Sequence, residues 1–293
     1  MQIALFGRVL NPDFLPDIEK MIRMLETKAE KFYIHTNLHS FLQQHIAFHV
    51  PAIPFRDYRQ IPCDCFCMIS IGGDGTLLDT LPYIRNSGIP VLGINTGRLG
   101  FLSAISTEDM ELSIRQLLEG NFQLDQRSLL LLESGEEQLF KAFPYALNEL
   151  TVLKRDNTTM ISISAWVNDI FLNTYWADGL MIATPTGSTG YSLSCGGPII
   201  SPDSENFIIT PIASHNLTVR PIVIKDNSVI KIRVEGRVKS HLIVMDSRSV
   251  PLENPVELMV KKADFKINLV CIGQRDFFTN IRNKLAWGFD KRN

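Results

Sequence analysis

An acid set inside a glycine turn is the feature of this sequence most able to do chemistry. Asp74 stands in the turn Gly72–Thr76, which reads GGDGT. Glycines let a ligand approach the backbone closely, and a helix beginning at Thr76 would aim free N–H groups at a phosphate. A carboxylate there would repel the anion. Asp74 therefore predicts either a metal ion beside phosphates or a general base that takes a proton from a hydroxyl. Simple helix capping by the aspartate stays open as an alternative.

Other short segments carry groups that could bind a nucleotide. The loop Gly93–Gly100 follows a predicted strand, and its Arg98 could pair with phosphate oxygens or face solvent. The stretch Asp178–Pro198 combines glycines and hydroxyls in unusual density, which suits a ribose or a phosphate. A generic long loop would explain those glycines but not so many hydroxyls. The pair Asn148-Glu149 adds a donor and an acceptor, although the dipeptide alone would mean nothing.

The elements that must position the glycine turn form an α/β pattern. The apolar run 65–71 stops at two glycines, as a central parallel strand buried on both faces does. A further strand is predicted at 90–95, and ligands bind where such strands end at the carboxyl edge of an open sheet. The other elements expected in this part are strands at 3–6 and 31–35, and helices over 18–29, 40–48 and 106–118.

The character of the chain changes near residue 122. Segments become short, β-branched or aromatic, which predicts a mostly antiparallel β-rich part. Strands are expected at 158–167, 228–234 and 241–245, and a helix at 276–287 that packs back onto the first part. The predicted domains are therefore residues 1–122, joined by about 276–293, and residues 123–275.

Composition excludes some classes of function. A net charge of -2 gives no field that favours nucleic acid or an anionic membrane, and no apolar run approaches the roughly 20 residues that span a bilayer. The first residues do not read as a signal peptide. The five cysteines are an odd number without zinc-site spacing, so free thiols in a reducing compartment are expected. We expect a cytoplasmic protein with neither nucleic acid nor a membrane as partner.

These features resemble the NAD kinase family. The matches are the GGDGT turn, the Gly93–Gly100 loop, Asn148-Glu149, and Asp178-Gly179 running into Thr184–Ser194, in the family's order and spacing. The first motif is shared with lipid and sugar kinases of a wider superfamily, whereas the last is highly specific. The resemblance implies a Rossmann-like α/β N-terminal domain and a β-rich, sandwich-like C-terminal domain. It also implies that NAD binds between them, often between subunits.

The resemblance further implies the reaction and its residues. ATP would phosphorylate the 2′-hydroxyl of the adenosine ribose of NAD to give NADP, with Mg²⁺ or another divalent cation bridging the phosphates of ATP. Asp74 would be the base. No metal ligand is assigned, and a homo-oligomer, dimer or tetramer, is expected. The residues expected to bind NAD or ATP are Asp74, Gly75, Asn148, Glu149, Trp176, Asp178, Thr186, Thr189, Gly190, Tyr191, Ser192, Leu193 and Ser194.

Three departures from the family pattern stand out. Asp79 occupies a position that is often basic in the family, and Trp176 stands where a basic or small residue would be expected. Asp246-Ser247-Arg248 replaces a turn that resembles D-G-Q. Two alternatives to an NAD kinase remain: a lipid or sugar kinase of the same superfamily, and a non-catalytic NAD(H)-sensing protein. The long Thr184–Ser194 stretch disfavours the first, and Asp74 disfavours the second.

Overall fold

The structure is a computed structural model that describes residues 1–8, 10–97, 100–103, 105–134, 139–155, 160–235, 240–253, 256–273 and 277–287. The chain divides into two compact units. The first comprises Met1–Gln126 and Ile267–Asn293, and the second comprises Arg127–Lys266. Arg98, a candidate phosphate contact in the sequence, lies outside the described residues.

A parallel sheet forms the centre of the first unit. Its central strand β4 (Cys67–Ile71) is buried along its whole length, which explains the continuous apolar run in the sequence. Parallel pairing extends on one side to β5 and the end of β17 (Val256–Cys271), where Leu269 lies opposite Val91. On the other side it runs through β1, β2 and β3. The flanking strands are β5 (Val91–Ile94), β1 (Gln2–Gly7), β2 (Lys31–His35) and β3 (Ala52–Phe55).

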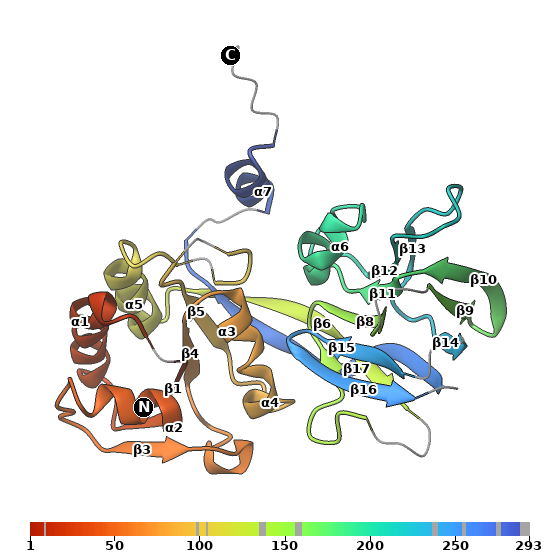
Figure 1. The fold of residues 1–293 in the computed structure, drawn as a ribbon. Coiled ribbons are helices and arrows are strands. Elements are labelled where there is room, and N and C mark those ends of the chain that lie inside the picture. Colours follow the sequence, from red (N-terminus) through yellow and green to blue (C-terminus); the bar gives the residue numbers. More distant parts are fainter. Residues whose placement is uncertain are drawn as a thin grey trace. The chain divides into compact units, whose positions relative to one another are not determined.

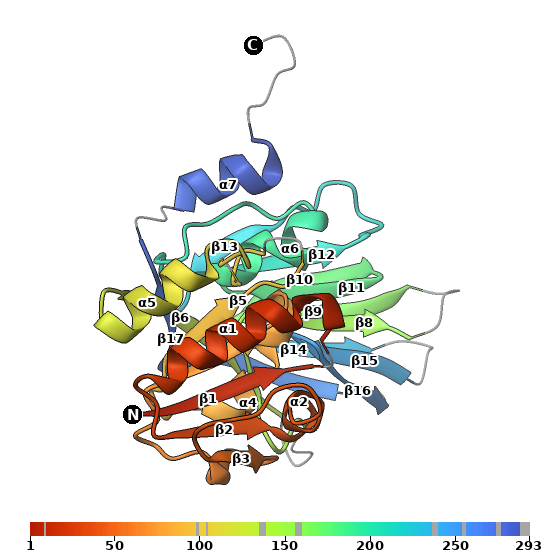
Figure 2. The same ribbon diagram turned by 90° about the vertical axis from the view of Figure 1, so that its left-hand side faces the viewer.

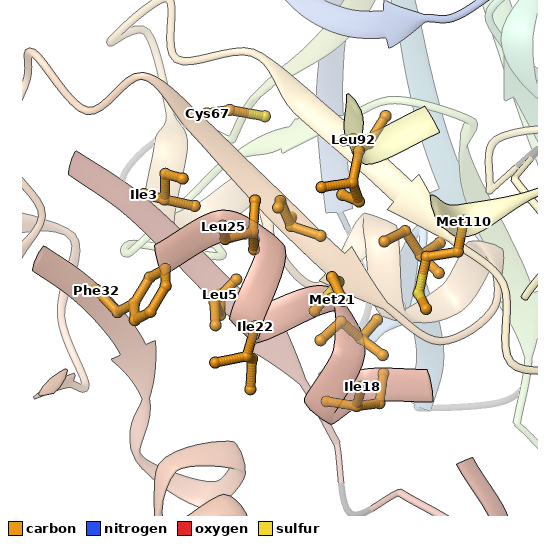
Figure 3. Packing of buried hydrophobic residues seen from close by; sticks show 14 of the residues in the cluster. Ile3, Leu5, Ile18, Met21, Ile22, Leu25, Phe32, Cys67, Leu92 and Met110 are labelled. Atoms are coloured by element: carbon orange, nitrogen blue, oxygen red, sulfur yellow. The ribbon is translucent and has the colours of Figure 1, made fainter. Parts of the chain in front are cut away.

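Helices cover both faces of this sheet. The helices α1 (Leu15–Glu26) and α5 (Met110–Glu119) lie side by side on one face, and α3 lies on the other (Figures 1 and 2). The buried face of α1 packs against β1, and Met110 of α5 joins the same cluster (Figure 3). The remaining helices of this unit are α2 (Thr36–Leu42), α3 (Asp74–Leu78), α4 (Leu81–Ile84) and α7 (Phe277–Leu285).

Several boundaries differ from the sequence-based predictions. The helix expected over 40–48 begins at Thr36, directly after β2, and the one expected from 106 begins at Met110. The strand β3 was not predicted because it contains Pro54 and follows Pro51. It lies at the sheet edge, where a missing N–H costs little. The helix after the glycine turn begins at Asp74 and has only 5 residues, so it contributes little dipole.

The second unit contains two sheets. One has the antiparallel order β10-β9-β14-β17, and the other has the order β13-β12-β11-β8-β15-β16. Of the strand expected over 158–167, residues 158–159 lie outside the described residues. The elements are β6 (Gln123–Glu133), β7 (Tyr145–Ala146), β8 (Glu149–Lys154), β9 (Ile161–Val167), β10 (Ile170–Ala177), β11 (Gly179–Ala183), α6 (Tyr191–Ser194), β12 (Asn206–Ile212), β13 (Ile222–Lys225), β14 (Ile230–Glu235), β15 (Ser240–Met245), β16 (Arg248–Glu253) and β17 (Val256–Cys271).

The two sheets of the second unit share one core. Val152 of β8 and Ile182 of β11 come from one sheet, and Ile163 of β9 and Ile232 of β14 come from the other. All four are fully buried in the same apolar cluster. This is the packing of a β-sandwich, as expected for the C-terminal part.

The tail helix α7 belongs to the first unit, also as expected. Within the described residues, no helix is long and apolar enough to cross a membrane.

Candidate functional site

The predicted acid, Asp74, opens α3 directly after the glycines that end β4. The backbone of Gly72 has φ +147°, a region that L side chains rarely adopt, and an added Cβ would lie 2.4 Å from Thr76 Oγ1. The first glycine of the turn is therefore fixed by backbone conformation and by packing. Asp74 is half-buried and Gly75 is exposed. The N-cap residue of α3 is Gly73, so Asp74 does not have the capping role left open above.

The carboxylate of Asp74 binds the segment that follows β5. Its Oδ2 accepts a hydrogen bond from Phe101 N at 2.7 Å. Its Oδ1 accepts from Leu102 N at 3.0 Å and from Ser103 N at 2.7 Å. These bonds join the turn after β4 to the loop after β5. What the sequence did not reveal is that backbone amides of Phe101–Ser103 bind this carboxylate.

A second group of predicted residues gathers in the second unit around Asn148 and Glu149. Glu149 is the first residue of β8, and Asn148 directly precedes it. Asn148 Oδ1 and Glu149 Oε2 are buried, and neither has a hydrogen-bond partner among the described residues. Buried polar atoms in folded proteins are nearly always paired. Two unpaired ones on adjacent residues therefore indicate a place where a ligand supplies the partners.

The carboxyl group of Glu149 is electrostatically unusual. Burial, and then the negative charge of Asp246, raise its pKa from 4.5 to about 8. Although Glu149 as a whole is half-buried, its Oε2 is shielded from solvent. The carboxyl is therefore protonated near neutral pH and can donate a hydrogen bond as well as accept one.

The chain after β11 folds directly onto this pair. Thr184 N donates to Asn148 O at 2.9 Å, and Thr184 Oγ1 donates to Leu147 O at 2.5 Å. A Cβ on Gly187 would lie 2.1 Å from Asn148 O, so the turn can pack this closely only with glycine. A Cβ on Gly190 would lie 3.4 Å from Glu149 Oε2. The structure thus brings two sequence motifs, about 35 positions apart in the chain, into one cluster.

The predicted binding residues of this stretch divide into exposed and buried groups. Tyr191 and Ser194 are exposed, whereas Thr189 and Leu193 are half-buried. The pKa of the Tyr191 phenol is raised by burial, then by the Cys195 thiol beside it and by the charges of Asp178 and Glu149. Tyr191 directly follows Gly190, where an added Cβ would lie 3.4 Å from Glu149 Oε2.

Other hydroxyls are engaged inside the protein. Ser192 Oγ lies 3.2 Å from Thr210 Oγ1 in a buried pair. Thr186 Oγ1 accepts from Arg127 Nη1 at 3.2 Å. The Ser192 side chain therefore contributes to the core on the inner side of α6, and its hydroxyl does not face outward as a ligand contact would.

Asp178 and Trp176 lie near the junction of β10 and β11. Asp178 Oδ1 forms an ion pair with Lys154 Nζ at 2.6 Å, and both side chains are partly exposed. Trp176 is 61% exposed, and its carbonyl accepts a hydrogen bond from His215 N. The charge of Asp178 contributes to the raised pKa of Tyr191.

Sequence reasoning missed the anchor of this cluster. Asp246, recognised only as part of a departure from the family pattern, accepts hydrogen bonds from the backbone N of Leu147, Asn148 and Glu149. Burial raises the pKa of Asp246, while these amides and the charge of Arg248 oppose that rise. Arg248 donates to the carbonyls of Phe143 and Tyr145. The available signal was an acid directly after the predicted strand 241–245, and its positive φ is seen only in the structure.

The described residues do not offer a preformed metal centre. No group of three or more His, Cys, Asp or Glu side chains among them could hold a metal ion. Asp74 has three of its lone-pair directions occupied by amides. The donor set therefore does not fit a cation held by protein side chains alone.

Comparisons with known proteins agree with the two-part organisation. Residues 9–122 match the ATP-NAD kinase N-terminal domain, and residues 147–272 match the ATP-NAD kinase C-terminal domain. The NAD kinase of Christiangramia forsetii is 42% identical, and that of Cytophaga hutchinsonii is 43% identical. Each alignment covers 100% of both chains.

Solved structures show the same fold. A yeast NADH kinase complexed with NADH has a TM-score of 0.88 at 21% identity, covering 99% of this chain and 89% of the other. An NAD kinase from Archaeoglobus fulgidus in complex with ATP has a TM-score of 0.75 at 25% identity, covering 98% and 99%. With both family domains matched and relatives above 40% identity over the full length, the chain belongs to the ATP-NAD kinase family.

Proposed function

We propose that this protein is an NAD kinase that transfers the terminal phosphoryl group of ATP to the 2′-hydroxyl of the adenosine ribose of NAD. Family membership supports the reaction. The observation that carries the assignment of a dinucleotide site is the unpaired couple of Asn148 Oδ1 and Glu149 Oε2. A ribose presents vicinal hydroxyls, each of which can donate and accept. One acceptor amide oxygen beside a protonated carboxyl matches that pattern.

The remaining predicted residues have supporting roles in this proposal. Gly190 and Tyr191 border the Asn148–Glu149 couple and would contact the nucleotide, as would Thr189, Leu193 and Ser194 on the same turn and helix. Asp178 Oδ1 is paired with Lys154, so the remaining lone pairs of the Asp178 carboxylate would accept hydrogen bonds from a ligand. The family resemblance still implies Thr186, Ser192 and Trp176 as binding residues. The side chains of Thr186 and Ser192 are buried, and that of Trp176 is exposed.

Asp74 is the proposed general base. Phosphoryl transfer requires an oriented hydroxyl and charge neutralisation more than covalent help from the protein. The hydroxyl proton moves to the Asp74 carboxylate as the ribose oxygen bonds to phosphorus. The bond between that phosphorus and the bridging oxygen breaks, and its electron pair leaves with ADP. Gly75, exposed beside Asp74, would give phosphate close access to the backbone.

A divalent cation, Mg²⁺ in the simplest case, is proposed as part of the donor. Mg²⁺ commonly binds through substrate phosphates with one or two carboxylates, rather than in an all-protein cage. Because the described residues offer no such cage, the cation would arrive on the phosphates of ATP and neutralise their charge. The proposal extends to a homo-oligomeric protein in the cytoplasm, since the family resemblance implies the first and the free cysteines favour a reducing compartment.

The decisive experiment incubates the purified protein with ATP, Mg²⁺ and NAD and measures NADP. Formation of NADP with equal release of ADP is expected. Phosphorylation of a lipid or sugar without NADP would favour a related kinase instead. Stabilisation of the fold by NAD without any turnover would favour a sensor. Replacing ATP by polyphosphate, and NAD by NADH, in the same assay defines the donor and the acceptor.

A further inference from the structure

The two oxygens of the Asp74 carboxylate are not equivalent. Oδ1 accepts from two amides, Leu102 N and Ser103 N, whereas Oδ2 accepts from Phe101 N alone. An ionised carboxylate has about four lone-pair sites, two on each oxygen. The bonds of the loop therefore fill Oδ1 and leave one site on Oδ2.

We propose that Gly100–Ser103 is a positioning segment that orients Asp74, so that Oδ2 is the oxygen that takes the proton from the acceptor hydroxyl. This inference rests on the proposed function, because it assigns the geometry of that reaction. In the proton transfer, the O–H bond of the ribose breaks and a bond to Oδ2 forms. The three amides remain on the carboxylate throughout, and they hold its plane in one orientation before the substrate arrives.

Gly100 is the residue that allows this arrangement. A Cβ at position 100 would lie 1.9 Å from Asp74 Oδ1 and 2.5 Å from Oδ2, closer than any real contact. The carboxylate thus lies directly against the Gly100 backbone. Any larger residue must displace either the acid or the loop, so Gly100 sets the position of the proposed base.

Contacts other than those to Asp74 also hold the segment in place. Ser103 is fully buried and packs so closely on β5 that a Cβ on Gly93 would lie 2.8 Å from Ser103 Cα. Asn95 N donates to Ile105 O at 2.7 Å, and Asn95 Nδ2 lies 3.4 Å from Ser103 O. Lys284 Nζ of the tail helix lies 4.7 Å from the centre of the Phe101 ring. A segment braced in this way is suited to fixing a side chain and poorly suited to moving away from it.

The first test follows the three amides by hydrogen exchange in the full-length protein, with and without NAD. Slow exchange at Phe101, Leu102 and Ser103 is expected in both states. Loss of protection on NAD binding would overturn the proposal, because it would mean that NAD displaces the loop amides from the Asp74 carboxylate. This measurement needs no turnover, so its outcome is separate from whether NADP forms.

The second test is Gly100→Ala, with Gly97→Ala as the matched variant. The added methyl at position 97 would make an ordinary contact of 3.7 Å with Asn95 Oδ1. A misplaced catalytic group lowers kcat by about 100-fold, so Gly100→Ala should approach that loss while its Kd for NAD changes less than about threefold. The kcat of Gly97→Ala should exceed that of Gly100→Ala by about tenfold or more.

The outcomes of the variant experiment separate the roles. Equal kcat values for the two glycine variants, or a loss confined to NAD affinity, would overturn the positioning role. If Gly100→Ala does not fold, the exchange measurement on the wild-type protein still decides.

A crystal structure with NAD bound shows directly which carboxylate oxygen faces the acceptor hydroxyl. The hydroxyl is expected within hydrogen-bond distance of Oδ2, the oxygen that accepts from Phe101. A hydroxyl bound to the other oxygen would overturn the assignment. Absence of NADP formation by the wild-type protein would instead reject the proposed function.

Discussion

Asp246 Oδ1 lies 2.8 Å from the backbone N of Asn148, and this bond links two segments almost 100 residues apart. The same carboxylate accepts from Leu147 N at 2.9 Å and from Glu149 N at 3.3 Å, and Asp246 N donates back to Glu149 O. One distant acid therefore accepts from all three amides of the backbone that presents the Asn148–Glu149 couple.

The first prediction concerns this anchor. In Asp246→Asn, the amide NH₂ would face a backbone N–H, so at least one donor loses its acceptor. We expect the free energy of unfolding to fall by about 1–3 kcal/mol, and KM for NAD to rise. Denaturant unfolding and steady-state kinetics measure the two effects. Asp169→Asn makes the same chemical change in an exposed turn and should shift stability by about 0.5 kcal/mol or less. Similar values for both variants would contradict the anchor role.

The second prediction concerns pH. The folded pKa of Glu149, about 8, exceeds its ordinary value of 4.5, so the folded state holds this proton more tightly than the unfolded state. The stabilisation from this proton is fully present below pH 4.5 and is lost as pH rises to about 8. Glu149→Gln removes the titration. Relative to this variant, the wild-type protein should therefore lose stability across that window.

Denaturant unfolding of both proteins at a series of pH values measures this difference. Because Asp246 also has a raised pKa, only the difference between wild type and variant isolates Glu149. Parallel curves for the two proteins would show that Glu149 is ionised in the fold at neutral pH.

The third prediction concerns the packing of the turn on Asn148. In Gly187→Ala the new methyl carbon would lie 2.1 Å from Asn148 O, so the turn must shift. Overpacking of this kind costs about 1–3 kcal/mol, and the shift should also weaken NAD binding. Thermal unfolding and NAD titration measure the two effects. An unchanged melting temperature would mean that the turn moves freely and does not shape the cluster.

The fourth prediction concerns the proposed base. Asp74→Asn should lower kcat for NADP formation by at least about 100-fold, because general base catalysis contributes about 100- to 10,000-fold. Asp13→Asn, which alters an exposed acid near α1, should change kcat less than about twofold. Unchanged turnover in Asp74→Asn would remove the base assignment, whatever the state of the loop.

Local chemistry in the sequence was enough to predict much of the architecture. The apolar run before Gly72 predicted a buried central strand, and alternating β-branched segments predicted the β-rich C-terminal part. The strand and the β-rich character follow from side-chain period and burial, which are local properties, whereas the sandwich arrangement was implied by the family resemblance. The edge strand β3 and the early start of α2 were missed, because tertiary pairing overrode the local signals of Pro54 and of the segment after His35.

The sequence by itself determined which residue types could serve the reaction: an acid among glycines, an Asn-Glu couple, and a run of hydroxyls. Only the tertiary structure decided what each of them contacts. It placed three amides of a later loop on Asp74, turned Ser192 inward, and made Asp246 the support of Asn148. These partners are up to about 100 positions apart in the chain, and hydrogen bonds depend on distances in space that no local pattern encodes.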